Sequence, residues 1–500
     1  MASARLMPAQ RNFITTQKGQ KRAKKRKLLP SLRWKWHEVS EGSFACICVS
    51  LALFGLTKKT AKLTIVNKLI FNALNPTKTK PLFADSSFYI KVLFIFSSFI
   101  IFVQTKRFYS MKTLVAKFRN ILKNVNTSYI RNIHNTIPWN DRLIAILGSR
   151  GVGKTTLVLQ HIKLHEDLDC TLFVYADDIW FSTHSLVSLA ETFYKEGGKV
   201  LYIDEIHKYK NWSQEIKNIY DTCPELKVRY TGSSILDLQK GNHDLSRRVL
   251  EYQMYGLSFR EYIALKYGTE IPIHSLEQVL ANKINFPYTE HRPIALFKEY
   301  LRTGYYPFFK EEGYELRLDK TINAILEVDI PKFAELSIST TEKLKMLLYI
   351  IAQSVPFKPN YSKIARDLDI HRNTVSDLMV WLDKADLINI LHDDVEGYKL
   401  LGKVNKIYLN NPNLAYVLSD NEPNIGNVRE TIFLSWMRVT HRVTASSVSD
   451  FKVDKYTFEV GGRKKGQHQI KDVDNAYIVK DDIEYGHKNE IPLWAFGLMY

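Results

Sequence analysis

Residues 143–157 read LIAILGSRGVGKTTL, in which five apolar residues lead into a glycine-rich segment that ends in a lysine and two threonines. The segment from Gly148 to Thr155 fits the pattern G-x-x-x-x-G-K-S/T, with an apolar run typical of a strand before it and a helix-like run after it. Glycine lets backbone N–H groups approach a polyphosphate because no Cβ intrudes, and the positive end of the following helix adds to the attraction. The stretch therefore predicts a phosphate-binding loop between a strand and a helix.

The residue types in this loop also predict how ATP and Mg²⁺ are held. We expect Lys154 to reach the β- and γ-phosphates and the hydroxyl of Thr155 to ligate Mg²⁺. The full set of predicted nucleotide-binding residues is Gly148, Ser149, Arg150, Gly151, Val152, Gly153, Lys154, Thr155 and Thr156.

Short apolar runs alternate with stretches of helical periodicity on both sides of the loop. The predicted elements are a lead-in helix or two over 111–135, strands within 171–181, 199–206 and 227–236, and helices over 185–197 and 212–223. Such alternation is typical of βαβ units. It predicts an α/β fold with a parallel sheet that helices cover on both faces.

The second chemical signal is VLYIDEIHK (200–208), an apolar strand that ends in two adjacent acids. Ligands of α/β sheets bind at the carboxyl ends of the strands, so we expect Asp204 to face the Mg²⁺ beside Thr155. Glu205 would then be the base that positions and polarises the attacking water. This pair favours hydrolysis by water over transfer to another molecule, as in a kinase.

Four more residues are candidates for the same reaction. The strand within 227–236 ends in small polar residues, so Ser233 or Ser234 would hydrogen-bond the γ-phosphate or the attacking water; the alternative is an ordinary turn. Arg247 or Arg248 would supply a cation that offsets transition-state charge, in cis or from a neighbouring subunit. The alternative for both arginines is a plain surface position.

Four segments together resemble a family of bacterial AAA-superfamily P-loop ATPases with a C-terminal domain of unknown function: GSRGVGKTTL (148–157), LYIDEIHKYKNW (201–212), RYTGSSIL (229–236) and LSRRVLEYQMYGLSFREY (245–262). The resemblance covers about residues 111–500. It implies an additional-strand ATPase core, with Walker A at Gly148 to Thr155, Walker B at Asp204 and Glu205, and the sensor at Ser233 or Ser234. Ring assembly is common among AAA relatives, so a homo-oligomer is an expectation, although nothing in the chain fixes a ring.

Beyond the predicted ATPase domain (111–260), periodicity predicts a helical connector over 261–338. Residues 339–400 are interpreted as a winged helix: a helix, a helix-turn-helix and a wing. In a DNA-binding version, the second helix of the pair would turn His371, Arg372, Asn373 and Thr374 toward bases. The same helix carries Asp377, Asp383 and Asp386, which oppose phosphate. A packing module is therefore the alternative to a DNA partner.

Residues 401–500 resemble the PD-(D/E)xK nuclease core, in which a helix glutamate, a strand aspartate and an E-x-K triplet bind metal and activate water. In one alignment Glu430, Asp450 and Glu459 match in kind and order. Gly461 then stands at the lysine position.

The basic residues nearest to that position, Arg463 and Lys464, are displaced beyond a Gly-Gly pair. A second alignment makes Glu459 the strand acid and QIK (469–471) the triplet. Lys471 then fits, but Gln469 replaces a carboxylate. Because each alignment lacks one catalytic group, we expect a degenerate, nuclease-like α/β domain that binds or packs rather than one that cuts.

The net charge of +18 is concentrated at the start of the chain, where residues 1–110 hold 20 of the 70 Lys and Arg residues and 3 of the 52 acids. Residues 111–500 are therefore nearly neutral, and bulk charge gives no argument for a nucleic-acid partner there. The first segment combines the basic run 18–27 with apolar runs at 44–56 and 88–103. We expect Met111 to be the true start; the alternative is a membrane-associated leader or a membrane helix near 88–103.

The four cysteines, Cys46, Cys48, Cys170 and Cys223, show no metal or disulfide spacing, which suits a reducing, cytoplasmic compartment. Taken together, the sequence predicts a Mg²⁺-dependent ATPase that couples hydrolysis to rearrangement of its C-terminal domains. The alternatives are a nucleotide-gated DNA-binding or DNA-cutting protein and a nucleotide-binding scaffold with little turnover.

Overall fold

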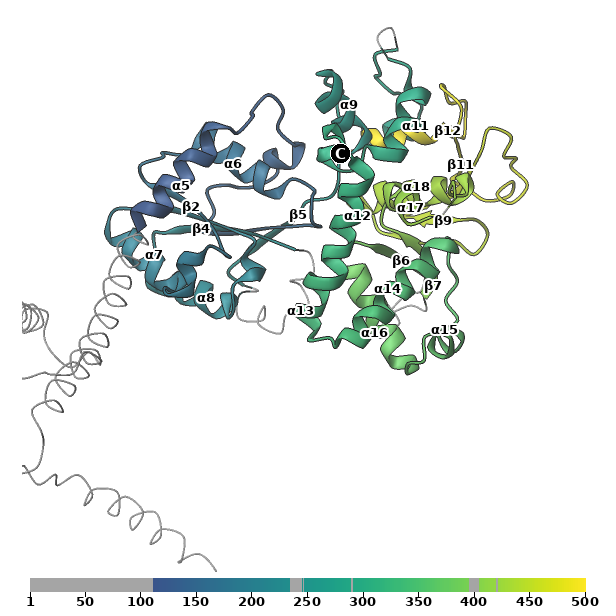
Figure 1. Ribbon diagram of the computed structural model, residues 1–500. Helices are drawn as coiled ribbons and strands as arrows, with labels where there is room; N and C mark the ends of the chain where they lie inside the picture. Colours follow the sequence, from purple (N-terminus) through teal and green to yellow (C-terminus); the bar gives the residue numbers. More distant parts are fainter. Residues whose placement is uncertain (1–110, 234–244, 246, 289–290, 395–403, 420) are drawn as a thin grey trace, which may run out of the picture. The chain divides into compact units, whose positions relative to one another are not determined.

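The computed structural model describes residues 111–233, 245, 247–288, 291–394, 404–419 and 421–500 (Figure 1). Ser234 and the predicted membrane segment near 88–103 lie outside these residues. Among the helices of the described part, none combines the length and the apolar composition needed to cross a bilayer.

Five parallel strands form the first sheet, in the order β2-β3-β4-β1-β5. They are β1 (Leu143–Leu147), β2 (Thr171–Tyr175), β3 (Val200–Asp204), β4 (Lys227–Gly232) and β5 (Leu250–Gln253). The predicted parallel α/β sheet is confirmed, and β4 is the strand that lies between β1 and β3. Strand β5 was not predicted, because its residues LEYQ are half-buried or exposed at the sheet edge and form no apolar run.

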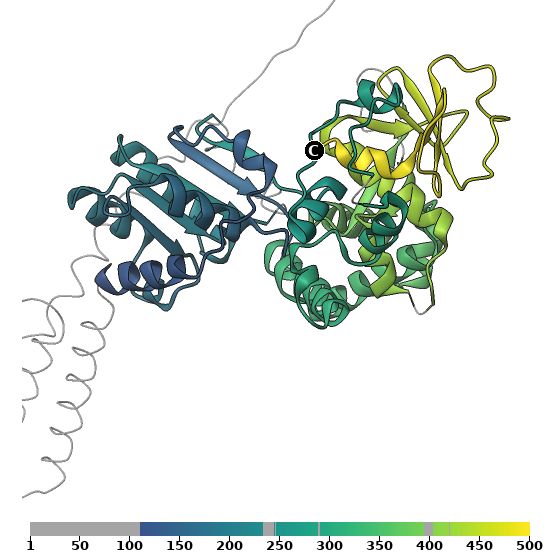
Figure 2. The ribbon, with the colours of Figure 1, turned by 90° about the horizontal axis from the view of Figure 1, so that it is seen from above.

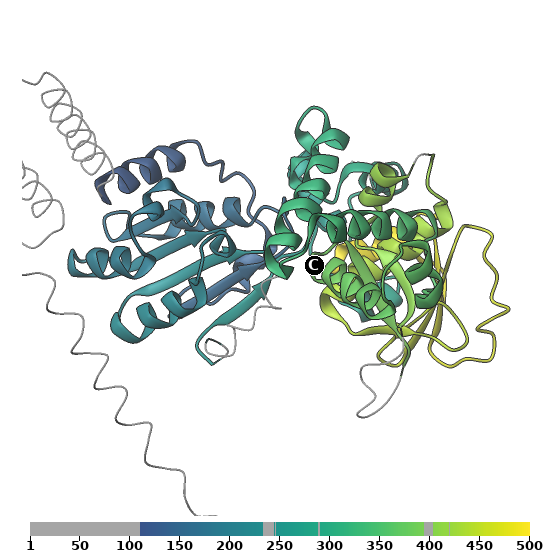
Figure 3. The same cartoon turned by 60° about the horizontal axis from the view of Figure 1, so that its bottom comes forward.

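Helices cover both faces of this sheet (Figures 1 and 3). Helices α5 (Met111–Lys123) and α6 (Lys154–His165) lie on one face, and α7 (Leu186–Lys195) and α8 (Trp212–Thr222) lie on the other. Helix α5 turns an apolar stripe inward, since its buried residues Leu114, Phe118 and Leu122 recur every four positions. This layering fixes the carboxyl ends of β1, β3 and β4 beside the start of α6.

The chain then continues through short helices, which are α9 (Phe259–Tyr267), α10 (Leu276–Leu280), α11 (Pro293–Thr303), α12 (Tyr314–Ala324) and α13 (Ile330–Ala334). Helix α9 begins at a capping box, in which Ser258 and Glu261 satisfy each other's backbone N–H groups. A π-helical segment, η8 (Ile325–Asp329), joins α12 to α13. Segments of this kind are rare and recur at functional sites.

Three helices and a hairpin follow in the region interpreted as a winged helix. They are α14 (Ile338–Gln353), α15 (Tyr361–Asp367), α16 (Arg372–Lys384) and the antiparallel strands β6 (Ile388–His392) and β7 (Val404–Leu409). His371, Arg372 and Asn373 are exposed at the start of α16. Residues 395–400 of the predicted wing lie outside the described part, and DNA contact stays a prediction.

The second sheet has the order β12-β11-β10-β9-β8 and mixes both orientations. Its strands are β8 (Val443–Ala445), β9 (Phe451–Val453), β10 (Tyr456–Gly461), β11 (Ala476–Lys480) and β12 (Glu490–Pro492), with β10, β11 and β12 parallel. Helices α17 (Pro412–Leu418) and α18 (Ile425–Thr440) precede it. Figure 2 shows the terminal helix η10 (Leu493–Leu498), in yellow, beside these strands.

Candidate functional site

The loop between β1 and α6 has a backbone that only glycine accommodates readily. Gly148, Gly151 and Gly153 have φ angles of 155°, 88° and 100°. A Cβ built on Gly148 would lie 2.3 Å from the carbonyl oxygen of Met254, so this glycine also permits a close approach of two backbones. Gly153 is the N-cap of α6, and the amides of the first turn therefore open onto the loop.

Lys154 lies across the loop that precedes it. Its ammonium group donates to the carbonyl oxygens of Gly148, at 2.9 Å, and Ser149, at 3.0 Å. The side chain is buried, and burial lowers the pKa of Lys154, while the carboxylates of Glu205 and Asp204 oppose that shift. Among the described ion pairs none joins this ammonium to a carboxylate, so its direct partners are the two loop carbonyls.

Asp204, at the end of β3, receives two hydroxyl groups. Thr155 Oγ1 donates to Asp204 Oδ2 at 2.8 Å, and Thr231 Oγ1, from β4, donates to Oδ1. Only 1% of Asp204 is exposed, and burial raises the pKa of its carboxyl group. The structure therefore brings the two predicted metal ligands together.

Thr231 was not among the predicted site residues, which on the predicted strand within 227–236 were the two serines Ser233 and Ser234. Its hydroxyl also accepts the backbone N–H of Glu205 at 3.0 Å, so it orients both acids at the end of β3. The signal that could have identified it is its position as the last polar side chain within a strand next to β3.

Glu205 itself has a left-handed backbone, with φ of 55°, which few non-glycine residues adopt. Its Oε2 lies 3.5 Å from Nε2 of His207 and 3.7 Å from Nζ of Lys208. Burial lowers the pKa of His207 to about 4, so the imidazole beside Glu205 is neutral at pH 7. Backbone strain of this kind clusters at functional sites.

Downstream segments pack against the phosphate-binding loop. Arg150 lies 3.6 Å, from its guanidinium nitrogen to Oδ2, from Asp329 in η8. A Cβ built on Gly151 would lie 2.9 Å from Cε1 of Phe308, in the helix η7 (Pro307–Lys310). Asp329 is buried, and burial raises the pKa of its carboxyl group, whereas Arg150 lowers it. The loop is thus in direct contact with the helices that follow the first sheet.

A buried ion pair fixes the other side of the loop. Arg131 pairs with Glu261 at 2.8 Å and donates to the carbonyl oxygen of Val152 at 3.2 Å. The same guanidinium donates to the carbonyl oxygens of Tyr255 and Gly256, just before α9. One side chain therefore connects the phosphate-binding loop to the segment that leads out of the sheet.

The remaining predicted residues are less closely associated with the loop. Ser233 is half-buried directly after β4, and Thr156 is exposed on α6. Arg247 is exposed, and Arg248 pairs with Asp221 of α8 at 3.4 Å. The sensor and arginine-finger roles stay predictions.

The acids of the first nuclease-like alignment lie in one cluster with two lysines. Lys406 Nζ lies 3.6 Å from a carboxylate oxygen of both Glu430 and Asp450. Lys465 pairs with Glu459, which is almost completely buried. Burial raises the pKa of the Glu430 and Asp450 carboxyl groups.

The lysine that the alignment lacked at Gly461 is replaced in space by Lys465. A Cβ built on Gly461 would lie 2.7 Å from Cγ of Lys465, so the glycine makes room for that side chain. Arg463, Lys464 and Lys471 are exposed. Gln469, from the second alignment, faces Glu459 with its amide, and the amide orientation that satisfies both groups lets its nitrogen donate to the carboxylate.

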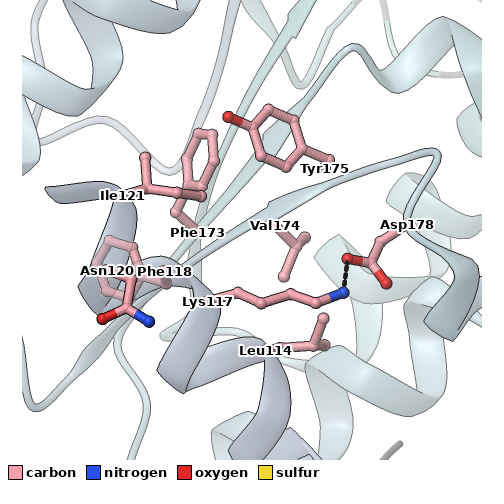
Figure 4. Close-up of a pocket in the computed structure, with 9 residues that line it drawn as sticks. All are labelled: Leu114, Lys117, Phe118, Asn120, Ile121, Phe173, Val174, Tyr175 and Asp178. Carbon is pink, nitrogen blue, oxygen red and sulfur yellow. Dashed lines mark hydrogen bonds and ion pairs between the residues drawn. The ribbon is translucent and has the colours of Figure 1, made fainter. Parts of the chain in front are cut away.

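A pocket of about 260 Å³ lies between α5 and β2 (Figure 4). Its lining is mostly apolar, and the ion pair between Lys117 and Asp178 closes one side. None of the lining residues belongs to the phosphate-binding loop, so this pocket is not the candidate nucleotide site.

Comparisons with known proteins agree with this geometry. Residues 140–263 match the family model described as an AAA domain, and residues 294–424 match a domain of unknown function, DUF8612. The chain is 30% identical over 289 residues to the uncharacterized protein MJ1637 of Methanocaldococcus jannaschii, covering 54% of this chain and 59% of the relative.

Three solved structures are also similar in part. Katanin, from a study of its self-assembly, has a TM-score of 0.21 and 14% identity, and the match covers 33% of this chain and 62% of katanin. The Hsp104–ADP complex of S. cerevisiae has a TM-score of 0.23 and 15% identity over 53% of this chain and 42% of Hsp104, and PCH-2 of C. elegans has a TM-score of 0.21 and 16% identity over 55% of this chain and 66% of PCH-2. The two family models show that the chain carries an AAA domain followed by a domain of unknown function, as the sequence resemblance predicted.

Proposed function

We propose that this protein is a Mg²⁺-dependent ATPase in which bound nucleotide controls the contact between the phosphate-binding loop and the helices after it. The observation that carries the proposal is the hydrogen bond between Thr155 and Asp204 beside the buried ammonium of Lys154. The glycine-rich loop fits phosphate because it ends at the N-terminus of α6, where unpaired backbone N–H groups favour an anion. The hydroxyl and carboxylate oxygens fit Mg²⁺, which prefers oxygen ligands.

Each residue has a defined task in this proposal. The loop amides and Lys154 bind the phosphates, and Lys154 exchanges its two carbonyl partners for phosphate oxygens. Thr155 and Asp204 would hold Mg²⁺, which supplies positive charge to the phosphates when bound. Glu205 accepts the proton of a water whose oxygen attacks the γ-phosphorus, and ADP is the leaving group. The hydroxyl of Thr231 holds the Asp204 carboxylate and the Glu205 backbone in position through its two hydrogen bonds.

The coupling follows from what Arg150 contacts. Its guanidinium lies next to Asp329, a buried carboxylate, and a phosphate oxygen would compete for the same cation. Binding of ATP would therefore weaken the contact with η8 and free the helices α12 and α13 on either side. By linkage, anything that holds η8 against the loop weakens nucleotide binding by the same factor.

Replacing Asp329 by asparagine tests both parts of this proposal. We expect the full-length chain to release phosphate from ATP with Mg²⁺ and not with EDTA, and D329N to bind Mg·ATP about fivefold more tightly or better, within the usual range of coupling energies. Asn keeps the size of the side chain but removes its competition for Arg150. Phosphate release and titration calorimetry are the measurements.

Asp319→Asn is the matched control, since Asp319 lies on α12 and contacts Asn323 rather than the loop. Equal affinity of D329N and wild type would refute the coupling. Absence of both heat and phosphate release in well-folded wild-type protein would refute the ATPase.

A second candidate function is metal-dependent cleavage of DNA by the C-terminal domain. The observation that favours it is Lys465, which stands beside Glu459 where the sequence has no lysine in the expected place. In this proposal Glu430, Asp450 and Glu459 would bind the metal, and Lys465 would assist the attacking water.

Cleavage of duplex DNA by the full-length chain in Mn²⁺ measures this activity. We expect K465Q to lose cleavage by about 100-fold, the size of one proton-transfer or charge-stabilising group, and the exposed neighbour variant K464Q to retain it. A wild-type chain that leaves DNA intact, or equal cleavage by both variants, would show that the cluster only packs.

A further inference from the structure

A cluster of three histidines lies at the other end of helix α6 from the phosphate-binding loop. His161 and His165 are one turn apart on α6, and His134 comes from the short helix η2 (Asn132–Asn135). One ring nitrogen from each histidine lies within 4.8 Å of the other two. The ATPase proposal uses none of these side chains.

The ring nitrogens are arranged as metal ligands require. Nε2 of His134 and Nδ1 of His161 lie 3.0 Å apart and share a hydrogen bond, which the two nitrogens would give up to bind one ion. The other nitrogen of His161 lies 3.6 Å from the carboxylate of Glu166, which in turn accepts the hydroxyl of Tyr202 at 2.6 Å. Metal-binding histidines typically direct their second nitrogen to such an outer carboxylate.

Aromatic packing holds two of the rings in place. The Trp139 ring stacks on His161 at 3.7 Å between centroids, with 11° between the planes, and its indole N–H donates to the backbone carbonyl of His134. His161 is buried and His134 half-buried, and burial lowers the pKa of both imidazoles. Neutral imidazole is the form that binds a metal.

His165 distinguishes a binding site from a packed pair of rings. It is exposed on α6, yet its ring lies 5.1 Å from that of His161 and 5.3 Å from that of His134, measured between centroids. The spacing of four residues on α6 places this ring beside His161, and because it is exposed an ion could reach the cluster from the solvent on this side.

We propose that His134, His161 and His165 bind one divalent cation of the zinc class, with water as a fourth ligand. Three neutral imidazoles select Zn²⁺, Cu²⁺ or Ni²⁺ over Mg²⁺ or Ca²⁺, which prefer oxygen. Zinc with three protein ligands and one open position is a recurrent arrangement. The ion would join the segment before β1 to the end of α6.

Zinc titration of the metal-free, untagged full-length chain tests this proposal by calorimetry, with Co²⁺ absorption in the visible range as the readout of coordination. We expect one ion per chain and the intense bands of four-coordinate Co²⁺. H134Q and H165Q should each lower Zn²⁺ affinity by about tenfold or more, since even outer-sphere changes have effects of that size.

Two matched variants separate the cluster from other sites. His184, which stacks on Trp180 outside the cluster, should be dispensable, so H184Q keeps the wild-type affinity. D204N should also retain Zn²⁺, because Asp204 belongs to the proposed Mg²⁺ site. Wild-type affinity in H134Q and H165Q, no binding by the wild type, or loss of Zn²⁺ in D204N alone would overturn the proposal, whatever the ATPase result.

Discussion

Glu205→Gln is expected to lower the rate of ATP hydrolysis by about 100-fold or more while ATP stays bound, because a general base contributes a factor of that size. Glutamine fills the same space but cannot accept a proton from water. The backbone N–H of residue 205 still donates to Thr231, so the end of β3 keeps its geometry. Single-turnover phosphate release, together with the nucleotide content of the re-isolated protein, measures both halves of the expectation.

Glu191→Gln, on helix α7, is the control for the loss of one carboxylate, since Glu191 pairs only with Lys195 among the described ion pairs. A rate of hydrolysis in E205Q equal to that of the wild type would show that Glu205 is not the base. The proposed Mg²⁺ site at Thr155 and Asp204 would not be affected by this result.

Lys154→Ala should weaken binding of Mg·ATP by about 100-fold, or about 3 kcal/mol, as is typical when one partner of a buried charge pair is removed. The ammonium of this lysine lies inside the loop, on the carbonyls of Gly148 and Ser149. Its removal leaves the loop amides and Arg150 to attract the phosphates. Titration calorimetry gives the dissociation constant.

Lys163→Ala is a matched control on the same helix, because its exposed ammonium donates to the carbonyl of Val125 at the far end of α6. Thermal melting of both variants checks that each is folded. A dissociation constant for K154A within about twofold of wild type would show that phosphate does not bind where the lysine points.

The loop and the acids that the structure brings together could be located in the sequence because their signals are local. The loop is identified by glycines at fixed spacing with an apolar strand before them and a helix after them. The other half of the candidate site is identified by the acids at the end of β3. The order of the strands, with β4 between β1 and β3, was not predicted by any residue pattern, and the family resemblance implied only an additional-strand core. Strand β5 escaped because an edge strand needs few apolar residues.

Contacts between distant segments left no such signal. Arg150 and Asp329 are ordinary charged residues in the sequence, and only folding shows that η8 reaches the loop. Lys465 was not predicted, although its neighbours Arg463 and Lys464 were considered, because the sequence does not show that a turn brings this lysine back over Gly461. The histidine cluster is an intermediate case: the spacing of His161 and His165 is visible, but His134 joins them only in three dimensions.

The segment after β5 gives the fold a further property. Met254 donates its N–H to Leu147 at 2.7 Å and places its carbonyl against Gly148, and the next two residues are gripped by Arg131 before α9 begins. The segment after β5 is thus held beside the phosphate-binding loop by contacts at three consecutive residues. Residues inserted into this segment would break the contacts that connect the downstream helices to the loop. We therefore expect the length of the segment to be nearly invariant in evolution, even where its side chains change.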